Sequence, residues 1–120
     1  MKRPDMTEMM AHRKLRRNLG EDLASKLSQG DISVRELATR VAGDLHMKTG
    51  SAEGYIYRML KARTNPEYPS DREKYARYFG HFTTGELDNY KVILKAAGFS
   101  NSSPIVKKLE ESFRQDFKYS

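Results

Sequence analysis

Residues 33–61 decide the fold, and they read SVRELATRVAGDLHMKTGSAEGYIYRMLK. The stretch opens with Ser33 and has Glu36 three positions later, which is the pattern of a capping box at a helix start. Apolar residues then recur at spacings of three and four, as they do on the buried face of a helix. These residues are Val34, Leu37, Ala38, Val41 and Leu45.

A turn is expected at residues 47–50, because Gly50 interrupts the pattern before a second apolar stripe begins. The following helix is expected to start at Ser51 and to end before Asn65-Pro66, since the residue before proline disfavours helix. Its inward residues are Ala52, Tyr55, Ile56, Met59 and Leu60. Two amphipathic helices joined by a short turn predict a helix-turn-helix.

The rest of the chain predicts an all-α fold, a compact bundle of five to six helices. Leucines every fourth residue predict a helix from Thr7 to about Gln29, either continuous or divided near Gly20. Further capping boxes begin at Ser70 and Thr83, Gly98 is placed to end a helix, and Ser103-Pro104 opens the last one. Strand patterning is nearly absent.

Composition narrows the function. The 120-residue chain has no cysteine, which excludes disulfides and thiolate metal sites, and it has no apolar run long enough to span a membrane. Its net charge is +6, of which +5 falls within residues 1–66. A localised positive charge is typical of a surface that binds a polyanion, because each neutralised phosphate releases a counterion.

The helix after the turn supplies the candidate base contacts. With Ile56 inward, its opposite face is polar, and Arg58 is the residue suited to bidentate recognition of guanine. Gly54 leaves room for close backbone approach. The candidate residues for DNA base contact are Ser51, Gly54, Tyr57, Arg58 and Lys61.

Cations near the N-terminus and around the turn are candidates for phosphate contact, which positions a protein on DNA. They are concentrated in His12-Arg13-Lys14-Leu15-Arg16-Arg17. The full set of expected phosphate contacts is Arg13, Lys14, Arg16, Arg17, Lys48 and Arg63.

These pieces resemble the Cro and lambda-repressor type of helix-turn-helix domain. Residues 33–38 match its positioning helix, residues 54–60 match its recognition helix, and residues 63–66, 68–70, 75–80, 85–87 and 94–99 follow in the expected order. The resemblance covers about two-thirds of the chain and implies binding to duplex DNA. The spacing from Ala38 to Ile56 is longer than in the family, so either the positioning helix or the turn is enlarged.

The last helix lies beyond the family-like region and must bury its apolar stripe, either on the same domain or on a second copy. We expect a homodimer with Ile105, Leu109 and Phe113 at the interface. The predicted organisation is a basic N-terminal extension or helix at 1–18, a DNA-binding domain at 19–100 and a self-association helix at 101–120.

Catalysis is not expected, because no nucleophile stands near a base at motif spacing. His12, His46 and His81 are far apart in sequence and predict neither a metal nor a cofactor site, and no small-molecule ligand is evident. The expected function is sequence-specific transcriptional regulation, with a cytoplasmic, nucleoid-associated location. Two alternatives are a DNA-organising partition or packaging component and a protein-interaction module that reuses the fold.

Overall fold

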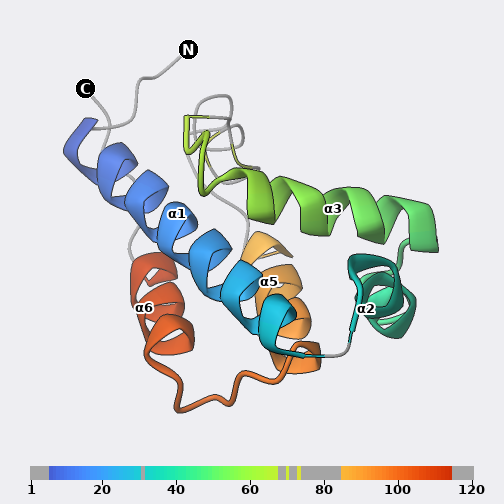
Figure 1. Ribbon diagram of the computed structural model, residues 1–120. Helices are drawn as coiled ribbons and strands as arrows, with labels where there is room; N and C mark the ends of the chain where they lie inside the picture. Colours follow the sequence, from blue (N-terminus) through green and yellow to red (C-terminus); the bar gives the residue numbers. More distant parts are fainter. Residues whose placement is uncertain (1–5, 31, 68–69, 71–72, 74–84, 115–120) are drawn as a thin grey trace.

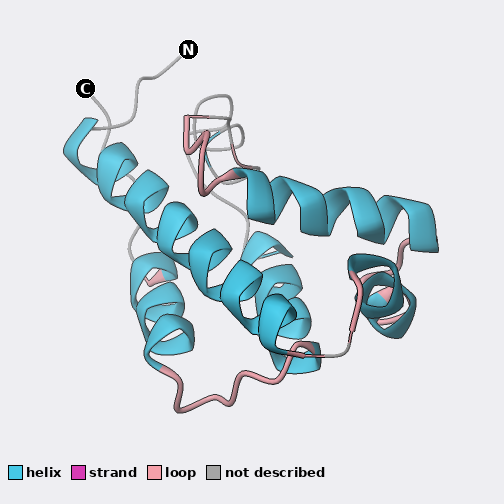
Figure 2. Cartoon of the chain, in the orientation of Figure 1, coloured by secondary structure: helices cyan, strands magenta, loops and turns pink. Residues whose placement is uncertain are grey.

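Five α-helices form the part of the chain that the computed structural model describes, namely residues 6–30, 32–67, 70, 73 and 85–114 (Figure 1). These are α1 (Met6–Gln29), α2 (Val34–Val41), α3 (Thr49–Lys61), α5 (Gly85–Ala96) and α6 (Pro104–Phe113). Figure 2 shows only helices and loops over these residues, which confirms the all-α prediction. None of the described helices combines the length and apolar character needed to cross a membrane.

The helices close a ring around one core. Helix α1 packs against α3 and α6, α2 packs against α3 and α5, and α5 also packs against α6 (Figure 1). Leucines and isoleucines from all five helices fill the centre, as their spacing predicts. The fully buried ones are Leu19, Leu23, Leu37, Ile56, Ile93, Leu94 and Leu109.

Helix α1 is continuous through Gly20 and is not divided there. Gly20 lies where α1 crosses α3, and a Cβ atom at this position would stand 2.6 Å from the carbonyl oxygen of Met59. The glycine therefore permits close approach of two helices rather than a break. Because α1 also runs across the boundary expected after residue 18, the basic segment belongs to a core helix and is not a separate extension.

The segment between α2 and α3 explains the unusual spacing. The backbone amide of Glu36 donates to Ser33 Oγ at 3.1 Å, so the predicted cap is present. Beyond Val41 the chain makes a further helical turn, which ends at His46 with a φ of 55°. The amide of Met47 donates to the carbonyl of Ala42 at 3.0 Å, as in a Schellman motif. The extra length thus lies in residues 42–48, which join α2 to α3, and α3 begins two residues before the expected Ser51.

The other predicted helix signals are present wherever the structure describes them. Glu73 N donates to Ser70 Oγ at 3.1 Å, although the rest of the helix expected there lies outside the described residues, as does the Thr83 cap. Gly98 has a φ of 109°, and Phe99 N donates to the carbonyl of Leu94 at 2.9 Å. Pro104 begins α6, as expected.

Helix α6 buries its apolar stripe inside the chain. Ile105, Leu109 and Phe113 are each at most 5% exposed, and α6 packs on α1 and α5. The ring of Phe113 meets that of His12 edge to face, with centroids 6.0 Å apart. The assignment of these three residues to a dimer interface is therefore wrong, because their side chains are already covered. Homodimerisation itself stays a prediction.

Candidate nucleic-acid interface

Helix α2 holds α3 by a shared apolar contact. Leu37 and Ala38 of α2 and Ala52 and Ile56 of α3 all have no exposed surface. Figure 1 shows α2 nearly end-on while α3 lies across the view, so the two helices cross steeply. This packing leaves the opposite side of α3 facing outward.

The outward side of α3 carries four of the five residues predicted to contact bases. Ser51, Gly54, Tyr57 and Lys61 are all exposed, and Tyr57, at 53% exposure, is one of the few large apolar side chains left open in the described residues. A Cβ atom at Gly54 would meet nothing within 4 Å, so the fold itself does not require glycine there. Glycine inside a helix lowers stability by about 1 kcal/mol relative to alanine. Its presence where the fold does not need it is suited to close approach by another molecule.

Arg58, the fifth predicted base contact, is only half-buried and lies against the protein. Its guanidinium carbon is 5.1 Å from the centroid of the Tyr55 ring, a cation–π distance. Tyr55 in turn packs against Tyr90, with ring centroids 6.0 Å apart. Arg58 is therefore held at the edge of the outward face rather than projecting from its middle.

Behind α3 lies a buried polar cluster that the sequence analysis missed. Arg16, Glu86 and Tyr90 are each at most 6% exposed, and the hydroxyl of Tyr90 donates to Glu86 Oε1. A cavity of about 10 Å³, the size of one water molecule, lies beside Arg16, Tyr55 and Tyr90. One sequence signal marks Arg16 as inward, since it follows His12 by four positions and precedes Gly20 by four on the buried stripe of α1.

Burial raises the pKa of Tyr90 well above its ordinary value of 10.0, and the negative charge of Glu86 raises it further. Above pH 10 the unfolded chain therefore loses this proton before the folded protein does. We expect the free energy of unfolding to fall as the pH rises from about 10 toward the folded-state pKa. Denaturant titrations over this alkaline range should show that the free energy of unfolding falls less steeply with pH in Tyr90→Phe than in the unaltered protein. An identical fall in both proteins would contradict the assignment.

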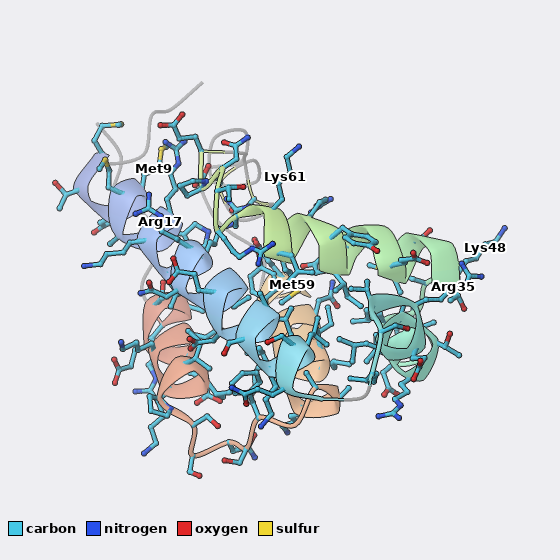
Figure 3. All side chains as sticks on the ribbon, in the orientation of Figure 1. Met9, Arg17, Arg35, Lys48, Met59 and Lys61 are labelled. Atoms are coloured by element: carbon cyan, nitrogen blue, oxygen red, sulfur yellow. The ribbon has the colours of Figure 1, made fainter. Side chains whose placement is uncertain are left out.

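The fold buries some of the basic residues of α1 and leaves others exposed. Arg16 is buried, and its Nη1 donates to the carbonyl of Pro66 at 3.2 Å, so the prediction that it contacts phosphate is wrong. Arg13 is half-buried and paired with the buried Glu73, its Nε lying 3.1 Å from Oε1. It does not offer the free cation that was expected. Lys14 and Arg17 are exposed, and Figure 3 shows Arg17 extending outward from α1.

The two remaining predicted phosphate contacts flank α3. Lys48 is exposed at the N-cap position of α3, where no side chain caps the helix. The first backbone amides of α3 are therefore not used by a capping side chain, which suits an anion. Arg63 is exposed just after the helix, and its Nε donates to the carbonyl of Leu60 at 3.1 Å. Figure 3 shows Lys48 and Lys61 at opposite ends of α3.

The two histidines that the structure describes lie on different elements. His12 is buried with its Nε2 2.9 Å from Ser70 Oγ, His46 lies in the turn before α3, and His81 is outside the described residues. Within residues 6–30, 32–67, 70, 73 and 85–114, no three metal-ligating side chains come together.

No protein-family model, curated protein or solved structure matches this chain.

Proposed function

We propose that the protein binds duplex DNA by inserting the outward side of α3 into the major groove, and that it regulates transcription. The observation that carries the proposal is this face, with Ser51, Gly54, Tyr57 and Lys61 exposed on a helix braced by α2. The major groove is wide enough for one helix. The resemblance to repressor-type helix-turn-helix domains supports the same conclusion.

Charge supports the proposal independently of shape. Lys48 and Arg63 flank α3, and their side chains would reach the phosphates on either side of the groove. Glu53, the carboxylate of α3, is paired with Arg35 of α2 at 3.2 Å, so part of its charge is compensated. Lys14 and Arg17 of α1 would extend the contact along the backbone. This function implies a nucleoid location.

The discriminating experiment is selection from a random duplex pool at physiological salt, followed by affinity measurements on the enriched site. We expect Tyr57→Ala to weaken binding to that site about 5- to 150-fold, the effect of losing a base contact of about 1–3 kcal/mol. Lys48→Ala should make the slope of log affinity against log salt shallower by about 0.9, the value for one phosphate contact.

Lys108→Ala is the matched control, because Lys108 is also an exposed lysine but lies on α6, whose main packing partners are α1 and α5. It should leave both quantities unchanged. If the Tyr57→Ala variant binds the enriched motif as tightly as the unaltered protein does, α3 is not the DNA-binding surface. Retention without a motif would indicate a DNA-organising role, and no retention would indicate a protein partner.

A further inference from the structure

A groove separate from the outward face of α3 lies between the N-terminal half of α1 and the turn at Pro66-Glu67. Its volume is about 340 Å³, within the range of small-molecule sites. Helix α1 provides one wall, with Met10, Arg13 and Arg17 on successive turns, and the segment after α3 provides the other.

The walls of the groove are held together by polar contacts that are buried or partly buried. Arg13 binds Glu73 through two hydrogen bonds, at 3.1 and 3.4 Å. The neighbouring Arg16 donates to the carbonyl of Pro66, and His12 lies 2.9 Å from Ser70 Oγ. Because these contacts join α1 to Pro66, Ser70 and Glu73, the groove exists before any ligand enters, which lowers the entropic cost of binding.

Part of the lining is apolar. Met10, Ala11 and Pro66 line the groove, and Met10 is 62% exposed. A methionine left open to water beside a concave surface is suited to an apolar ligand, because its flexible thioether adapts to different shapes. A phosphodiester backbone alone would gain nothing from these groups.

The charged part of the lining favours an anion. Lys14 and Arg17 line the groove and are exposed, and among the described residues neither lies within ion-pair distance of a carboxylate. The charge of Arg13 is compensated by Glu73, and Glu67 is the one carboxylate in the lining. Apart from the Arg13–Glu73 pair, the lining therefore carries two cations and one carboxylate.

We infer that this groove binds a small amphipathic organic anion, with its apolar body along Met10 and its acidic group between Lys14 and Arg17. The inference does not depend on DNA binding by α3. The sequence makes no small-molecule ligand evident, because the residues involved are brought together only by the fold.

The test uses anilinonaphthalene sulfonate as the fluorescent probe and the full chain. We expect saturable binding of one probe per chain, displaced by decanoate. The double variant Lys14→Ala/Arg17→Ala should bind at least about tenfold more weakly, the loss expected for charge-assisted hydrogen bonds. The control Lys107→Ala/Lys108→Ala removes two exposed lysines from α6 and should bind as the unaltered protein does.

Met10→Gln separates the two parts of the site. It should weaken binding of the probe while leaving all cations of the groove in place. Circular dichroism of each variant verifies that it is folded. Absence of saturable binding, or equal binding by the double variant and its control, overturns the inference. A double variant that loses affinity for DNA but not for the probe assigns Lys14 and Arg17 to phosphate contact instead.

Discussion

Replacing Gly20 with alanine is expected to destabilise the protein by about 2 kcal/mol, in the range of other overpacked cores. The added methyl carbon would stand 2.6 Å from the carbonyl oxygen of Met59, and this neighbour is backbone, which cannot rotate away. Helices α1 and α3 would have to separate. The higher helix propensity of alanine offsets at most about 1 kcal/mol of this cost. Chemical denaturation would give the free energy of unfolding.

Gly54→Ala is the matched control for Gly20→Ala. Both glycines lie inside helices, but a Cβ atom at Gly54 meets nothing within 4 Å. This variant should therefore be more stable by about 0.5–1 kcal/mol, the helix-propensity gain alone. If DNA approaches α3 closely at this position, Gly54→Ala will also bind DNA more weakly while being more stable. Equal stability changes for the two variants would contradict the close crossing at Gly20.

Truncation of Phe113 to alanine is expected to lower the free energy of unfolding by about 3–5 kcal/mol. The side chain is 5% exposed and fills the space between α6 and α1, where its ring meets His12. The loss should be the same at all protein concentrations, since the contacts lie within one chain. Thermal unfolding at several concentrations and sedimentation equilibrium would test this.

Phe113→Leu keeps most of the buried volume and serves as the milder variant. We expect a loss below about 1.5 kcal/mol, so this protein stays folded if Phe113→Ala does not. If the Phe113→Leu protein is folded but its oligomeric state has changed, or its stability now depends on protein concentration, α6 does form an interface between chains. That outcome would place the residue between two copies of the chain.

Local signals in the sequence were sufficient to predict where several helices begin and end. The Ser33–Glu36 cap, the turn at Gly98 and the start at Pro104 depend on residues a few positions apart, so each could be identified without the fold. The exposure of Ser51, Gly54, Tyr57 and Lys61 followed in the same way from the helical repeat once Ile56 was placed inward.

The surroundings of the basic residues of α1 could not be predicted from the local sequence. Four basic residues within five positions indicate a charged surface, yet Arg16 turns inward and Arg13 pairs with a residue 60 positions away. A helix of 24 residues must bury a stripe along its length, and the neighbours of these two arginines are Pro66, Glu73 and the Tyr90 side chain of α5. Sequence spacing carries no information about such partners.

The sequence by itself determined the helical class, the Ser33 cap, the helix end at Gly98 and the outward side of α3, because these depend on the periodicity and chemistry of neighbouring residues. Only the tertiary structure decided that Gly20 is a helix crossing, that α6 is part of the core and that Arg58 lies over Tyr55. It also assembled the groove from residues 10–17 and 66–67. The physical reason is that burial and pairing are properties of helices packed together, and the same side chain on an isolated helix would be free.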